Sequence, residues 1–205
     1  MKNWGLIAAV LLAALASGAT ARAELPISED VWQMAQRVRD SADHQRRPFA
    51  IVDKRAALLV VFHANGKLAG STAALLGSTY GDDSADGVGE RTQRGTLRAS
   101  DATTPAGRFL TQPGRNHTGE DVIWVDLDAA FAIHRLRPGG GHHMRAKRLA
   151  SASPVDNRVS AGCVVVAVAF FKGVVLPLLG RQPAVVYVLP EAGLAATGNK
   201  ASQGL

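Results

Sequence analysis

The feature that most constrains this 205-residue chain is a series of short apolar runs, rich in β-branched and aromatic residues and separated by turn residues. Three such runs, residues 49–53, 57–62 and 67–76, follow one another closely, and Asn65-Gly66 lies between the second and the third. An Asn-Gly pair between two such runs is the strongest short-range signal for a β-hairpin. The sequence therefore predicts antiparallel β-structure here.

Further strand-like runs occur at residues 121–127, 130–136 and 184–189. Between them, residues 77–103 are rich in Gly, Ser, Thr and Asp, and residues 137–156 contain a Pro followed by three Gly. Both segments are predicted to be surface loops. Several short strands separated by turn residues are typical of a β-sandwich or barrel.

Two segments are predicted to contain helices. Residues 28–45 combine an N-cap candidate, Ser28, with acidic residues in the first turn and an amphipathic apolar stripe. The apolar run at residues 164–180 fits a buried strand or a buried helix, and its length and Pro177 favour a short strand followed by a helix from about Val168. The expected fold class is therefore mainly β, a sandwich or barrel with peripheral helices.

The N-terminus predicts export. A short positive start is followed by an apolar run at residues 6–16 and by Ala21-Arg22-Ala23, the small-x-small pattern of a signal-peptidase site. Eleven helical residues span about 17 Å, whereas a bilayer core is about 30 Å thick, so this run is too short for a permanent anchor. Residues 1–23 are predicted to be a signal peptide, which indicates an exported protein of the periplasm or cell envelope without a transmembrane anchor.

The net charge of +6 does not indicate a nucleic-acid partner. Aromatic residues make up only 5% of the chain, which leaves few stacking platforms for single strands, and the basic residues are interspersed with acidic ones. The sequence has no helix-turn-helix or zinc-finger spacing. We interpret the charge as a solvated surface with affinity for anionic surroundings.

The lone cysteine, Cys163, is the first candidate for chemistry. A thiol with an ordinary pKa of about 8.5 is only a few per cent thiolate at pH 7, so catalysis needs a partner histidine or a helix N-terminus. Gly162 allows close backbone approach, and the amides of residues 162 and 163 are candidates for an oxyanion hole. The alternative is a small buried hydrophobic residue, because the apolar residues 164–168 follow directly.

His134 lies inside the apolar run 130–136, where a histidine needs a partner. It is either a hydrogen-bonded core residue or the base of a Cys–His pair with Cys163. His142 and His143 lie in the Gly-rich segment without any metal-binding spacing or second cysteine, so no metal site is predicted.

Three segments together resemble one family. Residues 104–109 (TPAGRF) resemble the TPxGxF segment of L,D-transpeptidase (YkuD-type) catalytic domains, and residues 132–134 (AIH) resemble the strand that carries the family's histidine. Residues 157–163 (NRVSAGC) resemble the nucleophile segment, whose common form is S/T-H-G-C. The resemblance runs from about residue 49 to 189, and the order and spacing of the segments make it specific.

The resemblance implies acyl transfer on peptidoglycan stem peptides. Cys163 would be the nucleophile and His134 the general base, with Gly162 and Ser160 giving backbone support. The thiolate would expel a terminal D-alanine and form a thioester, which an amine of another stem then attacks. The family needs no metal or cofactor. Attack by water instead would make the protein an L,D-carboxypeptidase.

The domain organisation that follows has four parts. They are a signal peptide (1–23), an N-terminal helical segment (24–48), an L,D-transpeptidase-like catalytic domain (49–190) and a flexible tail (191–205).

The sequence also departs from the family pattern. Ala161 replaces the histidine before the glycine, and Val165 stands where Arg or Asn is usual. Arg158 or Arg135, or the bases of residues 137–156, are candidates to supply the missing positive charge. Two other classes of protein are alternatives to an acyltransferase. A papain-like or NlpC-type peptidase places its cysteine before its histidine, the reverse of the order here. In a catalytically dead wall-binding domain, Cys163 would be a buried residue without a role in chemistry.

Overall fold

The computed structural model describes residues 26–194, so the predicted signal peptide lies outside the described residues. The strands are β1 (Phe49–Asp53), β2 (Leu58–Phe62), β3 (Leu68–Gly77), β4 (Gly107–Leu110), β5 (Gln112–Arg115), β6 (Asp121–Asp126), β7 (Phe131–Arg135), β8 (Arg158–Ser160), β9 (Val164–Val166) and β10 (Val185–Val188). The helices are α1 (Glu29–Ser41), α2 (Val88–Arg94), α3 (His142–Leu149), and a continuous helical segment made of α4 (Val168–Phe170), a π-helical turn (Phe171–Val175) and α5 (Leu176–Leu179). None of the helices within residues 26–194 has the length and apolarity needed to cross a bilayer.

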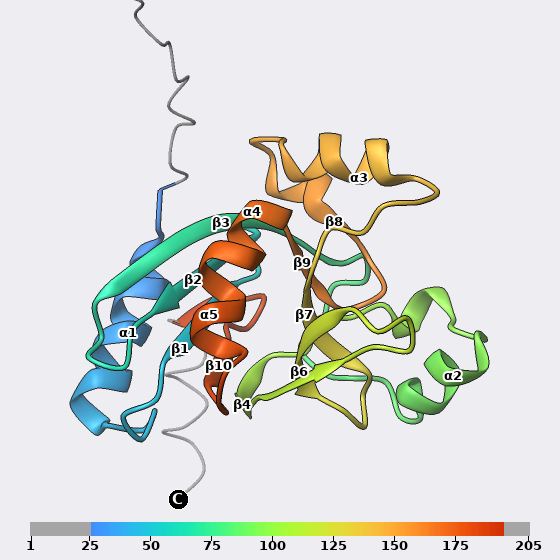
Figure 1. Cartoon of the computed structure of the whole chain (residues 1–205). Coiled ribbons are helices and arrows are strands. Elements are labelled where there is room, and N and C mark those ends of the chain that lie inside the picture. Colours follow the sequence, from blue (N-terminus) through green and yellow to red (C-terminus); the bar gives the residue numbers. More distant parts are fainter. Residues whose placement is uncertain (1–25, 195–205) are drawn as a thin grey trace, which may run out of the picture.

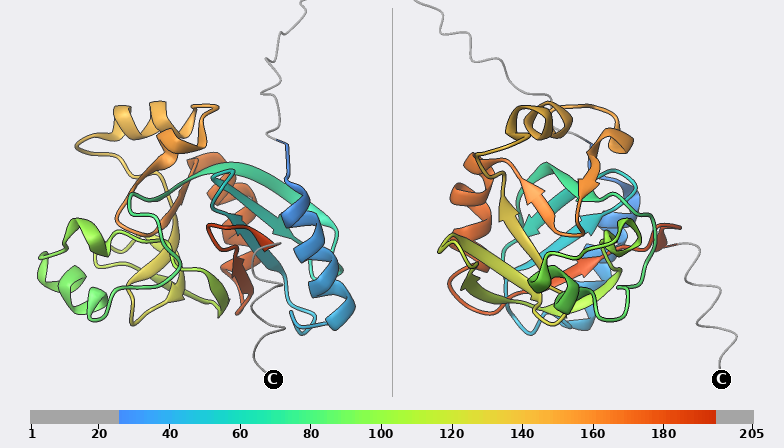
Figure 2. Two further views of the ribbon diagram at one scale, coloured as in Figure 1. Left: turned by 180° about the vertical axis from the view of Figure 1, so that it is seen from behind. Right: turned by 90° about the vertical axis from the view of Figure 1, so that its right-hand side faces the viewer.

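The strands of this region form one mixed sheet in the order β4-β10-β1-β2-β3-β9-β7-β6-β5, and β8 pairs with β3. β1 is antiparallel to β2 and parallel to β10, whereas β7 is parallel to β9. The sheet curls into a barrel-like shape, and α2 and α3 project from the part that contains β6, β7 and β9 (Figures 1 and 2). The predicted fold class, mainly β with an N-terminal helix and a helix after Cys163, is confirmed.

The hairpin predicted at Asn65-Gly66 is also confirmed. β2 and β3 are antiparallel, with Val60 opposite Ser71. Gly66 has φ +77°, and the Asn65 side chain accepts a hydrogen bond from the Lys67 amide at 3.0 Å. These are the two features that make Asn and Gly favourable in a tight turn.

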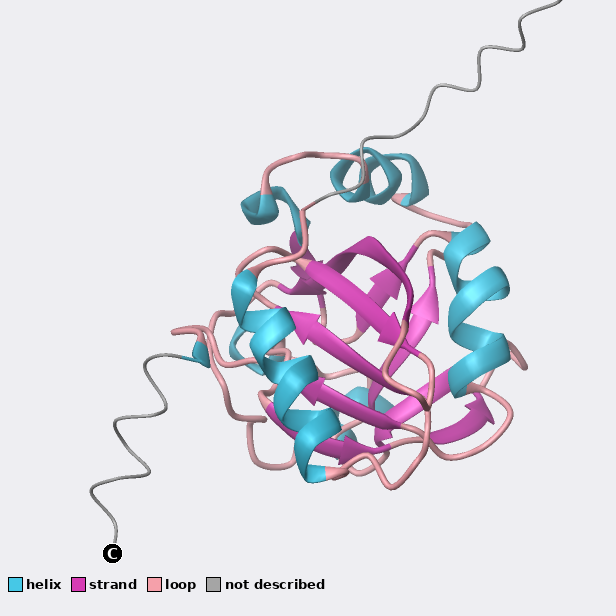
Figure 3. Cartoon of the chain, turned by 90° about the vertical axis from the view of Figure 1, so that its left-hand side faces the viewer, coloured by secondary structure: helices cyan, strands magenta, loops and turns pink. Residues whose placement is uncertain are grey.

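Both faces of β1 and β2 are buried, which explains why these segments are continuous apolar runs. On one face, Phe49 stacks on Phe62 with ring centroids 4.8 Å apart, in a cluster covered by α1. On the other face, Ala50 and Val52 join the larger cluster that packs against the helical segment 168–179. Figure 3 shows these helices on either side of the strands. A one-residue slip would exchange the two faces, so this double burial fixes the register.

Two helices lie where the sequence predicts only loops, which corrects those predictions. α2 lies within residues 77–103, and α3 lies within residues 137–156. α2 buries only Val88 and Gly89, and α3 buries only Leu149. Because neither helix has an apolar stripe, neither produces the periodicity by which an amphipathic helix is recognised.

The C-terminal segment is ordered further than expected. The predicted flexible tail, residues 191–205, begins with Glu191, whose carboxylate pairs with Arg158 at 2.7 Å, and Leu194 is buried in the cluster beneath α1. Residues 195–205 lie outside the described part of the chain. The chain therefore continues to pack against the domain for four residues beyond Pro190.

The stacked pair beneath α1 predicts a measurable stability cost. Phe49→Ala removes a fully buried ring and should lower the free energy of unfolding by about 3–5 kcal/mol. Leu68→Ala, at a position that is 44% exposed on β3, should change it by less than about 0.5 kcal/mol. Urea unfolding followed by circular dichroism measures both, and equal midpoints would contradict this account of the core.

Candidate active site

A tight turn between β8 and β9 holds Cys163. The Ser160 hydroxyl donates to the Cys163 carbonyl at 2.6 Å and accepts from the Gly162 amide at 3.1 Å. Gly162 has φ +120°, and a Cβ atom there would lie 2.7 Å from the Thr103 carbonyl oxygen. The position therefore requires glycine. The Gly162 amide, predicted as an oxyanion donor, is engaged by Ser160 in this structure.

A second hydroxyl group, that of Thr104, also holds this turn in place. Thr104 is fully buried, and its Oγ1 donates to the Gly162 carbonyl at 2.7 Å. The same oxygen accepts from the Gly77 amide at 2.8 Å, at the end of β3. Thr104 thus joins the TPAGRF segment, β3 and the turn before Cys163 at one atom.

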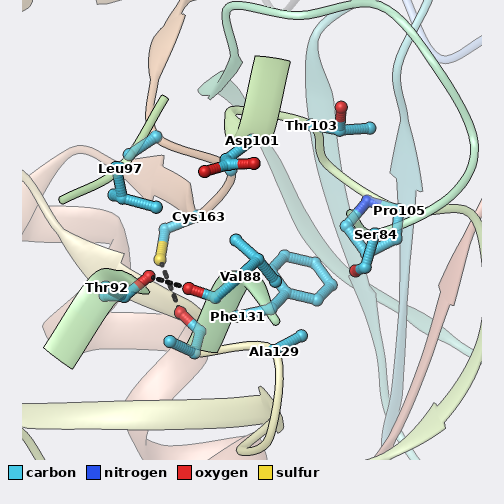
Figure 4. Close-up of a pocket in the computed structure, with 13 residues that line it drawn as sticks. Ser84, Val88, Thr92, Leu97, Asp101, Thr103, Pro105, Ala129, Phe131 and Cys163 are labelled. Atoms are coloured by element: carbon cyan, nitrogen blue, oxygen red, sulfur yellow. Dashed lines mark hydrogen bonds between the residues drawn. The ribbon is translucent and has the colours of Figure 1, made fainter. Parts of the chain in front are cut away.

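The Cys163 thiol lies in a small, covered pocket. Its Sγ donates to the Ala130 carbonyl at 3.6 Å (Figure 4). The cavity measures ≈ 60 Å³, against about 300–1,000 Å³ for usual small-molecule sites. Its walls come from the turn at Cys163, the residues before β7 and the α2 region, and they are Ser84, Val88, Thr92, Leu97, Asp101, Thr103, Pro105, Ala129, Ala130, Phe131, Ala161, Gly162 and Cys163. In this closed form a peptide does not fit beside the thiol.

An ion pair holds the α2 part of this cover. Arg91 donates to both carboxylate oxygens of Asp101 at 2.7 Å, and the Arg98 amide donates to the same group at 2.9 Å. The hydrogen bonds from Arg91 and from the Arg98 amide lower the pKa of Asp101 to about 2. The pair therefore persists as the pH falls below the ordinary carboxyl pKa of about 4, and it is lost only as the pH approaches 2.

His134 lies on the strand next to Cys163. In the parallel pairing of β7 with β9, Ile133 is opposite Val164 and His134 is opposite Val165. Ile133 and Val164 belong to the main core, whereas Val165 packs on the other face. Because side chains alternate along a strand, His134 lies on that other face, whereas Cys163 directly precedes β9 and has its thiol hydrogen-bonded to the backbone of Ala130 and Ala132.

The hydrogen bond of His134 determines its tautomer. Nδ1 lies 2.8 Å from the Arg135 carbonyl oxygen, which only accepts, so Nδ1 carries the proton. Burial, the largest cause, lowers the pKa of His134 to about 4, with a further lowering by the Arg137 charge. The ring is therefore neutral at pH 7, with an unprotonated Nε2 that is able to accept a proton.

The structure does not join Cys163 and His134 by a hydrogen bond within the described residues. The thiol bonds to Ala130, and His134 is outside the set of residues that line the Cys163 pocket. Burial raises the pKa of the Cys163 thiol, although the Ala132 amide and the Arg137 charge act in the opposite direction. At neutral pH the site therefore holds a neutral thiol at Cys163 and a neutral imidazole at His134.

Glu120 pairs with two arginines beside this site. Arg135 hydrogen-bonds to one Glu120 oxygen, and the Arg137 Nε lies 3.0 Å from the other. Arg135 was a predicted substrate-binding residue. Arg137 lowers the pKa values of both His134 and Cys163, so its positive charge acts on both groups. The sequence gives no reason to select Arg137 from the other bases of residues 137–156.

Arg158, the other predicted substrate-binding residue, has a structural role here. Its guanidinium donates to both Glu191 oxygens at 2.8 and 2.7 Å and to the Lys54 carbonyl at 2.8 Å. It also lies 4.5 Å from the centre of the Tyr80 ring. Binding of a substrate carboxylate by Arg158 would require the Glu191 pair to open.

Among residues 26–194 no group of three or more His, Cys, Asp or Glu side chains is arranged to hold a metal ion.

The two departures from the family pattern, at positions 161 and 165, lie in different surroundings. Ala161 is exposed and lines the Cys163 pocket. Val165 is only 6% exposed and packs against Leu136 and Leu149, so position 165 offers no polar group to a ligand.

No family model and no curated protein matches the sequence. Among solved structures, the fold is similar to the catalytic domain of the E. faecium L,D-transpeptidase, with 18% identity, a TM-score of 0.39, and coverage of 70% of this chain and 98% of that one. It is also similar to an L,D-transpeptidase from Xylanimonas cellulosilytica (18% identity, TM-score 0.39, coverage of 69% and 60%). A fused Zn-dependent amidase/peptidase/peptidoglycan-binding domain-containing protein from Clostridium acetobutylicum is a further match (16% identity, TM-score 0.38, coverage of 80% and 65%). This chain spans less than two thirds of the latter two chains.

Thr104 is expected to be essential for the shape of the turn. Thr104→Val leaves the Gly77 amide and the Gly162 carbonyl buried without their partner, at a cost of about 1–3 kcal/mol each. Thr104→Ser keeps the hydroxyl and should retain most of the stability. Urea unfolding of the two variants checks this, and a valine variant as stable as the serine variant would contradict the role assigned to Thr104.

The Arg91–Asp101 pair is expected to control access to the thiol. Asp101→Asn removes the charge that holds α2 over the pocket, so iodoacetamide should alkylate Cys163 several-fold faster in the native protein. Asp83→Asn, at an exposed position in the same segment, serves as the matched control and should react as the wild type does. Intact mass spectrometry measures the alkylation rates of the three proteins. Equal rates for all three would show that α2 does not limit access to the thiol.

Proposed function

We propose that this chain is an exported cysteine acyltransferase that acts on peptidoglycan stem peptides, with Cys163 as nucleophile and His134 as general base. The observation that carries the proposal is the state of His134. Its Nδ1–H is held by the Arg135 carbonyl, so the lone pair is on Nε2, and the strand that carries His134 pairs with β9, which begins directly after Cys163. The resemblance of residues 104–109, 132–134 and 157–163 to L,D-transpeptidase segments names the substrate class.

The proposed reaction has two steps. His134 Nε2 takes the thiol proton while Sγ attacks the carbonyl of the L-centre that precedes the terminal D-residue. The C–N bond then breaks, the imidazolium returns its proton to the leaving amine, and D-alanine departs from a Cys163 thioester. In the second step an amine of another stem attacks the thioester and forms the new amide, while its proton passes through His134 and the thiol is regenerated.

The closed site must open before this proton transfer is favourable. In the covered form burial raises the pKa of the thiol and lowers that of His134, so transfer between them is uphill. Displacement of the α2 cover would reduce the desolvation of Cys163 and bring the pKa of its thiol closer to that of His134. Productive binding of a stem peptide and activation of the thiol are therefore coupled through the same movement.

Two other outcomes compete with transfer. Water in place of the amine would make the protein an L,D-carboxypeptidase, which shares the first step. The second alternative is a catalytically dead wall-binding domain. The small pocket and the hydrogen bond between Cys163 Sγ and the Ala130 carbonyl favour it.

A thioester is the expected product in the decisive experiment. Mature protein, residues 24–205, is mixed with a tetrapeptide-stem muropeptide, and intact mass and free D-alanine are followed over time. The wild type should show a transient adduct and release D-alanine. Cys163→Ala should show neither, and His134→Ala should form the adduct about 10²–10⁴-fold more slowly. An added acceptor amine then separates cross-linking from hydrolysis.

The opposite result is equally clear. If neither adduct nor D-alanine appears and the thiol is alkylated only after denaturation, the acyltransferase proposal is wrong. The wall-binding alternative then accounts for the tight turn around a buried, inert cysteine.

A further inference from the structure

The surface of α3 carries a concentrated positive charge. The helix reads HHMRAKRL, and residues 129–155 contain no Asp or Glu. Lys147 and Arg148 are exposed and Arg145 is half-buried. We call these three side chains the α3 cationic face. Figures 1 and 2 show α3 projecting from the barrel beyond β8 and β9.

These cations differ from Arg135 and Arg137 because no acidic side chain of the described residues pairs with them. Within residues 26–194 no ion pair involves Arg145 or Lys147, and Arg148 donates to a backbone carbonyl, that of Asp156, at 3.2 Å. By contrast, Arg135 and Arg137 share Glu120. The α3 cationic face is therefore available to an external anion.

α3 is anchored on the face of the sheet that carries His134. Leu149 packs in one cluster with Leu136, which directly follows β7, and with Val165, which is paired with His134. An anion bound by α3 would therefore lie on the same face of the sheet as the proposed base, His134.

We propose that the α3 cationic face docks the carboxylate groups of the peptide stems in the cell-wall polymer, an inference that rests on the proposed function. Position 165, where the resembling family commonly has Arg or Asn, is a buried valine, so the charge for an anionic substrate must come from elsewhere. A bilayer surface fits less well. Residues 137–156 contain no aromatic side chain, and on α3 Met144 is the large apolar side chain that is exposed, so the helix has little to insert between lipids.

The test measures binding without turnover. Cys163→Ala protein is co-sedimented with purified sacculi, and the same is done in the background of Arg145→Gln, Lys147→Gln and Arg148→Gln combined. A control combines Arg46→Gln, Lys67→Gln and Arg181→Gln, which removes three positive charges elsewhere. The α3 variant should bind about tenfold more weakly, and the control should retain its affinity. Sacculi whose carboxyl groups are amidated should lose the α3-dependent part of binding.

Three results would overturn the docking proposal. They are unchanged binding of the α3 variant, an equal loss in the α3 and control variants, and α3-dependent binding to phosphatidylglycerol vesicles without α3-dependent binding to sacculi. Because no turnover is involved, α3-dependent binding alongside a failed thioester experiment would refute the acyltransferase function while the docking surface stands. Thioester formation with α3-independent binding would do the reverse.

Discussion

A buried ammonium group ties together the segments on which the candidate site depends. The Lys54 side chain is fully buried at the end of β1, and its Nζ donates to the Gly81 carbonyl and the Asp82 carboxylate at 2.6 Å and to the Thr104 carbonyl at 3.1 Å. An ammonium is costly to bury, and loss of one partner from a buried pair typically costs about 3–5 kcal/mol, so these contacts fix the segments firmly. Thr104, held in this way, fixes Gly162 and thereby Cys163.

The cluster around Lys54 also reaches the C-terminal segment. Glu191 lies 3.6 Å from the Lys54 Nζ and pairs with Arg158, and its amide donates to Asp82 at 2.9 Å. Burial raises the pKa of Asp82, but the hydrogen bonds from Lys54 and the Glu191 amide outweigh it, so that pKa lies below its ordinary value. The Asp82 carboxylate therefore stays ionised at neutral pH. A rigid, charged support thus lies next to a site whose own two groups are neutral.

The sequence predicts those parts of the molecule that depend on local patterns. Continuous apolar runs identify β1 and β2, Asn65-Gly66 identifies the hairpin, and the order of His134 and Cys163 places them on separate segments. The long-range polar contacts are not predictable in this way. In the sequence, Lys54 has the pattern of a surface lysine after a strand, and Glu191 lies in a predicted tail. Only the fold brings these two residues together, across more than a hundred positions of the chain. α2 and α3, which cover and flank the site, have no apolar stripe to reveal them.

The central claim is that His134 is a neutral base with its lone pair on Nε2, on the strand that pairs with β9 directly after Cys163. Nitrogen-15 NMR of the histidine rings, with His134→Ala used for assignment, measures both the tautomer and the pKa in the free protein. The account predicts a proton on Nδ1 at pH 7 and titration near pH 4, below the ordinary value of about 6.5. A proton on Nε2 at pH 7, or titration at the ordinary value, would contradict it.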